Sequence, residues 1–373
     1  MHHQALVIDA HADTPQRFLD EAWDFTAPAG DGMLSLDTAR AGGLDAEFFA
    51  VWVEPNEYAG QFASRTFALI EAVRSQCHRH RDHMRLCRSP KELLKARAEG
   101  KFAALIGIEG GHAIENSLDN LRAFHSLGAR YMTLTWSNTN EWADSSGDLH
   151  DPTVQHHGGL SAFGRTVVRE MNALGMMVDV SHVSDATLAD VLQTTAAPII
   201  ASHSSVRALN GSPRNLTDDQ LRAIAATGGA VMVNFYAAFL SDDWRAAWTA
   251  QAAERRAAHA ELESRYHSVS RPVPFAAQLS IDRDFAARIP PTPLSALIDH
   301  IDHIARIAGI DHVGLGTDFD GMCALPAEIR TAADLPKVTA ALIARGYTAE
   351  QMQQILGGNL LRVFGDVQAA AAR

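Results

Sequence analysis

Residues 102–109 read Phe-Ala-Ala-Leu-Ile-Gly-Ile-Glu, an almost unbroken apolar run that ends in a carboxylate. Such runs are typical of parallel strands that are covered by other structure on both faces. An isolated carboxylate at the end of a buried strand would carry a large desolvation cost. A structural ion pair would need an Arg or Lys close by, which this motif lacks. The stretch therefore predicts a buried strand whose last residue, Glu109, binds a metal, and its two oxygens allow it to bridge two cations.

Seven similar apolar segments lie before and after this stretch, and helix-length amphipathic segments separate most of them. This alternation predicts parallel strands that are covered by helices. Gly128, Gly175 and Gly228 stand just before predicted strands, where glycine can end a helix. Eight repeats favour an α/β fold of the closed (β/α)8 type, the TIM barrel, over an open sheet. The predicted strands are 6–9, 48–53, 103–108, 131–134, 176–180, 198–201, 230–234 and 313–315.

The chain has 373 residues, which allows either two domains or one large barrel. Its largest interruption is the segment 240–293, rich in Ala, Arg and Glu, which separates the seventh predicted strand from the eighth. Because the last strand must return to close the sheet, we interpret this segment as a helical excursion within a single catalytic domain, 1–373. It can serve as a lid, as a subunit contact or as a plain surface insertion.

The formal net charge of −12 argues against nucleic acid and against an anionic membrane as the main partner, because both select basic surfaces. The first nine residues lack the basic segment and apolar core of a secretory signal. No uncharged run of about 18 residues suggests a membrane span. We therefore expect a cytoplasmic protein. Cys77, Cys87 and Cys323 are interpreted as ordinary thiols, because they have no CxxC spacing.

Polar side chains follow five of the predicted strands, at the end of each strand. In a barrel of parallel strands these ends share one rim, so residues that are distant in sequence can meet there. His11 and Asp13 are separated by one residue, so an extended backbone can point both side chains to the same side. Imidazole and carboxylate ligands suit zinc, although other divalent metals accept them too. Taken alone, the His-x-Asp pair is equally compatible with a structural role.

Two histidines occupy equivalent places at the ends of adjacent predicted strands. His182 ends the stretch Val-Asp-Val-Ser-His, and His203 ends Ile-Ile-Ala-Ser-His. One such histidine could be a hydrogen-bonded core residue, but two on the same rim as Glu109 predict nitrogen ligands for a second metal. Asp179 could instead support a ligand through a hydrogen bond or be purely structural.

Asp318 follows the last predicted strand, in the stretch Val-Gly-Leu-Gly-Thr-Asp-Phe-Asp-Gly at residues 313–321. We expect Asp318 to face the site as a proton acceptor beside a bound water. Asp320 we expect to organise the turn through its Asp-Gly pair. Two metals about 3.5–4 Å apart can polarise a substrate carbonyl and hold a hydroxide for attack. The pattern thus predicts hydrolysis and not redox chemistry.

The same residues lie in motifs that resemble the membrane (renal) dipeptidase family of amidohydrolase-like metal enzymes. The resemblance covers almost the whole chain, from Ile8 to Phe364. The His-x-Asp pair sharpens it, because related amidohydrolases commonly have His-x-His. The most specific segments are Glu109-Gly110-Gly111-His112, Ser202-His203-Ser204-Ser205, Arg214-Asn215, Met232-Val233-Asn234-Phe235-Tyr236 and Asp318-Phe319-Asp320-Gly321.

The resemblance implies a dipeptidase with two divalent metal ions, both zinc. One zinc would be bound by His11, Asp13 and Glu109. The other would be bound by the bridging Glu109 together with His182 and His203.

The resemblance also implies how a small dipeptide, the expected partner, would be processed. Asp318 would take a proton from the water between the metals and pass it to the leaving amine. Arg214 would bind the terminal carboxylate, which a guanidinium can do through two hydrogen bonds. Members of the family often accept a D-residue at the C-terminal position. A homodimer is left open beside a monomer.

Trp136 is one departure from the family, in a substrate-binding position where a histidine commonly stabilises the developing oxyanion. An indole N–H can donate one hydrogen bond, but it cannot become cationic or accept one. The change affects either the catalytic efficiency or the substrate range. His150, His156 and His157 in the following loop could replace the histidine or could lie at the surface.

Two other functions stay compatible with these residues. Trp136 favours a two-metal hydrolase of another amide, an ester or a lactone. The segment 240–293 offers a partner surface to a catalytically weak metal-binding or interaction protein.

Overall fold

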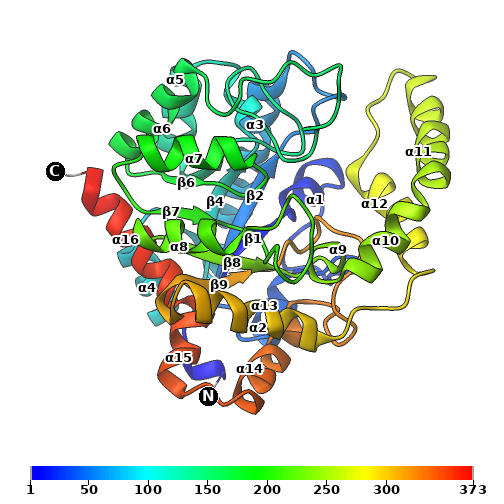
Figure 1. Ribbon diagram of the computed structural model, residues 1–373. Helices are drawn as coiled ribbons and strands as arrows, with labels where there is room; N and C mark the ends of the chain where they lie inside the picture. The colour runs from blue at the N-terminus through cyan, green and yellow to red at the C-terminus, as the bar shows by residue number, and fades with distance from the viewer. Residues whose placement is uncertain (1, 372–373) are drawn as a thin grey trace.

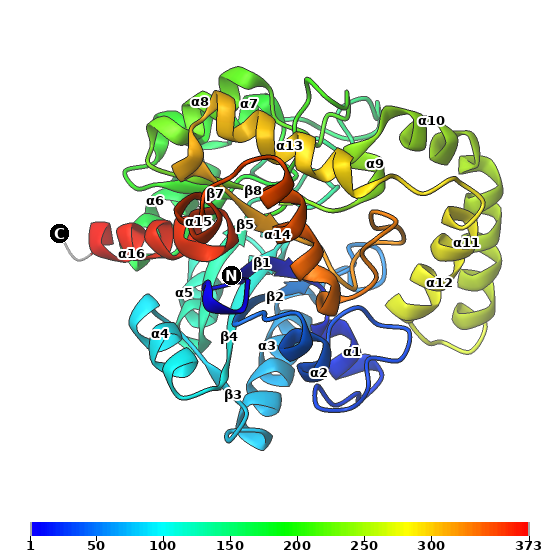
Figure 2. The ribbon, with the colours of Figure 1, turned by 90° about the horizontal axis from the view of Figure 1, so that it is seen from below.

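The computed structural model describes residues 2–371, which form a barrel of parallel strands surrounded by helices (Figure 1 and Figure 2). Neighbouring strands pair in the order β1, β2, β4, β5, β6, β7, β8 and β9, and β9 also pairs with β1, so the ring closes. The closed ring of eight parallel strands confirms the predicted TIM barrel. Its strands are β1 (Ile8–Ala12), β2 (Ala46–Trp52), β4 (Phe102–Glu109), β5 (Ala129–Thr133), β6 (Met177–Asp179), β7 (Ile199–Ala201), β8 (Ala230–Asn234) and β9 (Val313–Gly316).

The sheet differs from the prediction in one additional strand and in the bounds of several strands; β2, for example, begins at Ala46 and not at residue 48. A ninth strand, β3 (Met84–Leu86), pairs with the start of β4 outside the ring. Its three residues are too few for a periodic pattern, so the sequence carries no signal for it. The first strand begins two residues later than predicted and includes His11, because its pairing with β2 continues to Ala12.

Helices lie between successive strands and after β9, and most of them cover the outer face of the barrel (Figure 1). Their ends follow from local chemistry: α6 begins after Ser161, whose hydroxyl accepts a hydrogen bond from Gly164 N–H, and it ends at Gly175 in the left-handed conformation. These helices are α1 (Pro15–Asp20), α2 (Leu36–Ala41), α3 (Phe62–Arg79), α4 (Pro90–Ala98), α5 (Leu118–Leu127), α6 (Ala162–Leu174), α7 (Asp185–Thr194), α8 (Asp218–Ala226), α9 (Ala237–Leu240), α13 (Leu294–Ile307), α14 (Leu335–Ala344), α15 (Ala349–Gln353) and α16 (Asn359–Ala371).

The segment between β8 and α13 contains three further helices, α10 (Asp242–Ala250), α11 (Ala252–His267) and α12 (Phe275–Ala286). They stand together at one side of the barrel (Figure 1, Figure 2). In α11 the only buried side chain is Leu262, whereas α12 buries Leu279, Phe285 and Ala286. Helix α12 is therefore packed more deeply than α11.

Side chains from several strands pack together inside the ring. Phe48 on β2 and Tyr131 on β5 belong to strands that are not neighbours, yet their ring centroids lie 5.3 Å apart. Gly107 on β4 leaves the space for Tyr131, because a Cβ at this position would lie 1.9 Å from Tyr131 Cζ. The glycine in the apolar run 102–109 is thus required by packing inside the barrel.

Candidate metal centre

The side chains of the five predicted ligands converge around Glu109 at one rim of the barrel. Glu109 Oε2 lies 3.4 Å from His11 Nε2. Glu109 Oε1 lies 2.9 Å from His182 Nε2 and 3.4 Å from His203 Nε2. Asp13 Oδ2 lies 3.7 Å from His11 Nε2. Each of the five residues is less than a tenth exposed, so the cluster is buried.

The ends of the parallel strands place these residues at one rim. Glu109 is the last residue of β4, where it pairs with Trp52 on β2 and Thr133 on β5. His182 and His203 follow β6 and β7. His182 has a φ of 67°, a left-handed conformation that is uncommon outside glycine. Backbone strain of this kind clusters at functional sites.

The orientation of His11 is set by Tyr131. The Tyr131 hydroxyl donates to the carbonyl of Ala10 at 3.1 Å, so it accepts from His11 Nδ1, which lies 2.8 Å away. Nδ1 therefore carries the N–H, and Nε2 faces Glu109 and Asp13. A hydrogen bond that fixes the tautomer in this way is typical of histidines that bind metals.

A hydroxyl relay sets the orientation of His203 in the same way. Ser202 Oγ donates to Asp179 Oδ2 at 2.6 Å, so it accepts from His203 Nδ1 at 2.7 Å. Asp179 also accepts a hydrogen bond of 2.5 Å from Thr133 Oγ1. This places Asp179 behind the histidine ligand and leaves Nε2 of His203 facing Glu109.

The electrostatics of the cluster favour bound cations. Burial lowers the pKa of His11, but the carboxylates of Glu109 and Asp13 raise it to about 10, so these carboxylates favour a positive charge beside them. Burial raises the pKa of Asp13 well above its usual value, and the charge of Glu109 raises it further. His11 Nε2 and Asp13 Oδ1 have no hydrogen-bond partner within residues 2–371. Nitrogen and oxygen atoms that lack hydrogen-bond partners and surround a central carboxylate are suitable ligands for a divalent metal such as zinc.

Asp318 lies at the edge of the same cluster. Ligand atoms of His11, Asp13 and Asp318 all lie within 4.8 Å of one another. Asp318 has a φ of 62°, and its Oδ2 accepts a hydrogen bond of 2.9 Å from Asn234 Nδ2. A Cβ on Gly321 would lie 2.6 Å from Asp318 Oδ1 and 2.0 Å from Asp13 Oδ2. Gly321 therefore permits the two carboxylates to approach the loop.

Arg214 lies behind His203 and not in the cavity wall. Its Nη1 donates to Ser204 Oγ at 2.8 Å, and its Nη2 donates to the carbonyl of His203 at 3.0 Å. Its Nε is buried and has no hydrogen-bond partner among residues 2–371. Its guanidinium lies 5.4 Å from the ring centre of Phe239, which does line the cavity. Two of the five N–H groups of Arg214 are thus used, and the other three, that of Nε included, have no hydrogen-bond partner among residues 2–371.

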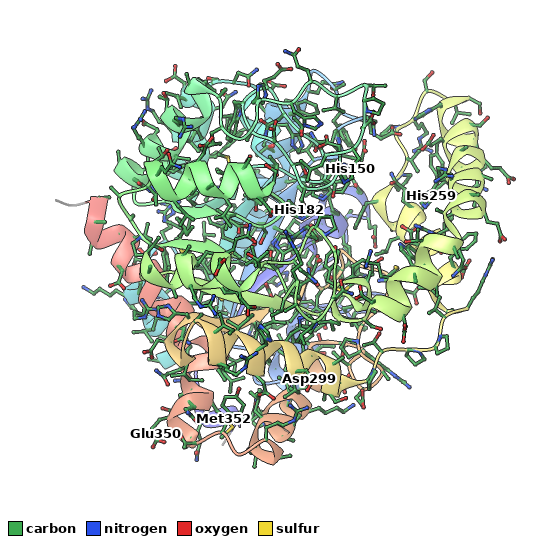
Figure 3. The ribbon with its side chains drawn as sticks, in the orientation of Figure 1. His150, His182, His259, Asp299, Glu350 and Met352 are labelled. Carbon is green, nitrogen blue, oxygen red and sulfur yellow. The ribbon has the colours of Figure 1, made fainter. Side chains whose placement is uncertain are left out.

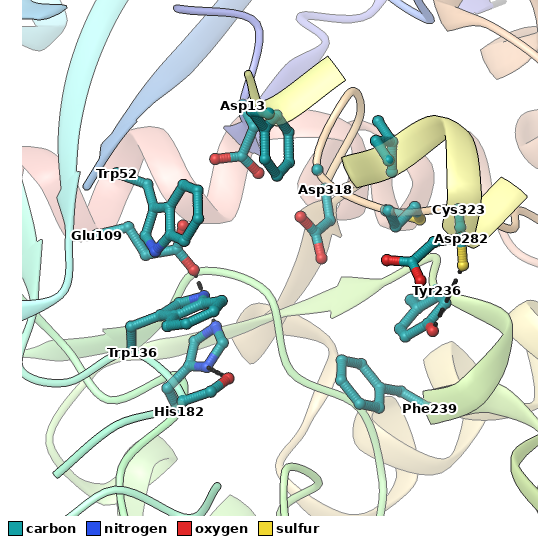
Figure 4. Close-up of a pocket in the computed structure, with 15 residues that line it drawn as sticks. Asp13, Trp52, Glu109, Trp136, His182, Tyr236, Phe239, Asp282, Asp318 and Cys323 are labelled. Carbon is teal, nitrogen blue, oxygen red and sulfur yellow. Dashed lines mark hydrogen bonds and ion pairs between the residues drawn. The ribbon is translucent and has the colours of Figure 1, made fainter. Parts of the chain in front are cut away.

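A cavity of about 190 Å³ opens onto the metal centre (Figure 4). It is smaller than the ~300–1,000 Å³ of pockets for drug-sized ligands, as a short substrate requires. Trp136 is part of its wall, with its ring centroid 4.8 Å from that of Trp52 and 6.4 Å from that of His182. The 15 lining residues are Asp13, Trp52, Glu109, Trp136, Ser137, His182, Tyr236, Phe239, Phe275, Leu279, Asp282, Asp318, Gly321, Met322 and Cys323.

The histidines that could replace a histidine at position 136 are not among the lining residues. His150 is exposed, in the long loop between β5 and α6 (Figure 3). His157 contacts the carbonyl of Asn140 at 3.0 Å.

Asp320 accepts hydrogen bonds from Thr14 Oγ1 and Met33 N, which links its turn to the N-terminal segment.

Several residues of the site were not predicted. Tyr131 lies within a predicted strand, and only its contact with His11 reveals its part. Trp52 ends β2, so the rule that strand ends share one rim could have identified it. Phe275, Leu279 and Asp282 come from α12, and no local pattern in the segment 240–293 marks them.

Comparisons with solved structures agree with this fold. The probable dipeptidase PvdM of Pseudomonas aeruginosa is similar with a TM-score of 0.84 and 26% identity, over 99% of this chain and 97% of that one. A metallo peptidase of Rhodobacter sphaeroides has a TM-score of 0.79 and 26% identity, over 97% and 99%. The metallo peptidase called dipeptidase AC has a TM-score of 0.79 and 27% identity, over 98% and 99%.

The barrel and the candidate metal ligands at its rim are those of a metallohydrolase of the TIM-barrel class. The chain belongs to the membrane dipeptidase family, peptidase family M19, whose model matches residues 1–373. The predicted family is thereby confirmed, and it places the chain among metal-dependent hydrolases of peptide bonds. Within residues 2–371, none of the helices has the length and apolar character that crossing a bilayer requires.

Proposed function

We propose that the chain is a two-metal dipeptidase, with zinc as the metal, that cleaves dipeptides with a free C-terminal carboxylate. The division of ligands between the two oxygens of Glu109 carries this proposal. Oε2 faces His11, which adjoins Asp13, whereas Oε1 faces His182 and His203. Each oxygen can therefore serve a separate metal. Metals held there would polarise the substrate carbonyl and activate a water for attack.

Arg214 is proposed to bind the substrate carboxylate. Burial lowers the pKa of Arg214 to about 10, so the side chain stays charged at neutral pH. Its two contacts with Ser204 and His203 hold the guanidinium in place, and its Nε keeps a free N–H. Hydrogen bonds between charged partners are the strong ones, so the free N–H groups of a fixed cation are a suitable anchor for a carboxylate.

Asp318 is proposed to move the proton. Its Oδ2 is held by Asn234, which leaves Oδ1 to accept a proton from the attacking water and to pass it to the leaving amine. Burial raises the pKa of Asp318, and the charge of Glu109 adds to this, while His11 opposes it. A carboxylate with a raised pKa is a better base, as this role requires.

We also propose that the enzyme tolerates a D-residue at the C-terminal position. The Rhodobacter sphaeroides metallo peptidase was solved with a phosphinate mimic of the dipeptide L-Ala-D-Ala. The similarity of the two chains over almost their full length supports the same substrate class for this one.

The test is to incubate zinc-loaded protein with L-Ala-L-Ala and L-Ala-D-Ala and to measure amine release. We expect turnover of both dipeptides, and we expect Asp318→Asn to lower kcat by about 10²–10⁴-fold. The exposed Asp243→Asn is the control and should keep wild-type rates. Failure to cleave any member of a broad dipeptide panel would overturn the proposal.

An ester or lactone hydrolase is the second candidate, because Trp136 stands in the cavity wall. Hydrolysis of esters or lactones without peptide cleavage would favour it. Two bound metals together with turnover that is lost in Asp318→Asn would instead exclude a catalytically weak binding protein. A single domain with 240–293 as an excursion, a cytoplasmic location and a homodimer stay predictions.

A further inference from the structure

The excursion 240–293 contributes part of the cavity wall through Phe275, Leu279 and Asp282 on α12. Four of the 15 lining residues are acidic, and three of these belong to the metal centre or adjoin it. Asp282 is the fourth, and Figure 4 shows it across the cavity from Glu109 and His182. It is the acidic side chain of the wall to which the proposed chemistry gives no task.

Helix α11 holds Asp282 in position. His259 Nε2 lies 2.9 Å from Asp282 Oδ1, and Arg255 Nη1 lies 3.7 Å from the same oxygen. Arg255 in turn lies over the ring of Trp248, with Cζ 3.5 Å from its centre. Oδ2 makes no hydrogen bond to residues 2–371, and the side chain of Asp282 is 28% exposed. The carboxylate is thus anchored by one oxygen and has the other free.

The rest of the wall suits a long cationic side chain. Trp52, Trp136, Tyr236, Phe239 and Phe275 all line the cavity. Aromatic faces attract cations, and the methylene stems of Lys and Arg pack well on apolar surface. Lys and Arg are absent from the 15 lining residues described, so none of these residues offers a guanidinium or ammonium group to an acidic substrate side chain.

We propose that Asp282 is a specificity-determining residue that selects dipeptides with a cationic side chain, Lys or Arg. The stem of that side chain packs between the aromatic residues, and its charged end donates to Oδ2 of Asp282. The excursion is then a specificity element and not a plain surface insertion. This inference rests on the proposed dipeptidase function.

The experiment compares lysine with norleucine, which has the same four-carbon length without the charge. Values of kcat/KM are measured for Lys-Ala and Nle-Ala, and for Ala-Lys and Ala-Nle. We expect wild-type enzyme to prefer lysine about tenfold in at least one position, as one charge-assisted hydrogen bond provides. Asp282→Asn should bring that ratio close to one. Asp284→Asn removes one charge from the same helix at an exposed position outside this cavity and should keep the wild-type ratio.

Each outcome separates this inference from the function on which it rests. Turnover of norleucine dipeptides without a lysine preference, or with a preference that survives Asp282→Asn, overturns the role of Asp282 alone. An absence of turnover on all four dipeptides overturns the dipeptidase as well. If Asp282→Asn does not fold, a salt titration of the wild type replaces it, because the lysine preference must fall as ionic strength rises. A preference that is independent of salt overturns the inference.

Discussion

Glu109 is the residue on which the proposed chemistry depends most. Burial by itself raises the pKa of this carboxyl group, but the charge of His11 and the close contacts with His182 and His203 hold it well below its usual value. The group is therefore ionised at neutral pH. An ionised carboxylate with each oxygen turned to a different histidine group is suited to bridge two metals.

Glu109→Gln is expected to lower the metal content from two ions per chain, because a neutral amide is a poor bridge. The loss of affinity should exceed the about 10–100-fold that follows loss of a hydrogen-bond partner of a ligand. Elemental analysis after gel filtration measures it, with the exposed Glu141→Gln as control. Unchanged stoichiometry would show that Glu109 is not a ligand.

At the scale of the elements, β4 and β5 together orient a ligand on β1. Gly107 on β4 leaves room for the ring of Tyr131 on β5, and the Tyr131 hydroxyl accepts from His11. A side chain that carries no chemistry of its own thus controls the tautomer of a proposed metal ligand. The strand pairing brings the three residues together although Tyr131 is 120 positions from His11.

Gly107→Ala is expected to destabilise the protein by about 1–3 kcal/mol, because the new methyl group meets Tyr131 Cζ inside a closed ring. It should also weaken metal binding by about 10–100-fold through displacement of the Tyr131 hydroxyl. Denaturant unfolding and chelator competition measure the two effects. Gly365→Ala, on helix α16 with its nearest contact at 3.7 Å, should leave metal affinity unchanged. Wild-type metal affinity in Gly107→Ala would contradict the role of Tyr131 in orienting His11.

A second link between elements is a buried acidic pair on β1 and β2. Glu47 is fully buried, and neither of its oxygens has a hydrogen-bond partner within residues 2–371. Asp9 accepts from Thr317 N at 2.8 Å and from the Thr317 hydroxyl. Burial, and next the charge of Asp9, raise the pKa of Glu47 well above its usual value.

This raised pKa makes stability depend on pH. The folded protein keeps the Glu47 proton above about pH 4.3, where the unfolded chain releases it. Stability is therefore lost as pH rises from about 4.3 through the folded pKa. The Gln side chain of Glu47→Gln cannot ionise. The free energy of unfolding of the variant, relative to that of the wild type, should therefore increase with pH over that range and stay constant above it. Urea unfolding from pH 4 to 8 measures the difference, and a difference that is constant with pH would contradict the prediction.

At the scale of the whole molecule, the closed ring decides which residues meet. The five ligand candidates come from the ends of β1, β4, β6 and β7, and they converge because β9 pairs with β1. Of the three helices α10 to α12, helix α12 lines one side of the cavity at the same rim. We therefore expect metal binding and folding to be coupled through the barrel as a whole.

Removal of metal with a chelator is expected to lower Tm and to abolish dipeptide turnover, and added Zn²⁺ should restore both. Metal at 100 times its Kd stabilises the folded state by about 2.7 kcal/mol. Differential scanning calorimetry with and without chelator measures the change. Glu109→Gln should show a smaller shift, and equal shifts in both proteins would place the metal elsewhere.

The sequence predicts features that depend on a local pattern, and it does not predict features that depend on contacts between distant segments. Each of the eight barrel strands was located, because an apolar run is a local pattern. The ligand candidates were located by residue type at strand ends, and all five meet in the structure. Tyr131, Trp52 and Asp282 were not predicted, because their parts depend on contacts with distant segments.

The sequence by itself determined the strand–helix alternation, the barrel and the polar residues at its rim, because hydrophobic burial acts along each short segment. Only the tertiary structure decided which oxygen of Glu109 faces which histidine, and that Tyr131 and Ser202 set the tautomers. It also decided that α12 brings Asp282 to the cavity. These arrangements depend on ring closure and on side-chain packing between residues far apart in the chain, which no local pattern encodes.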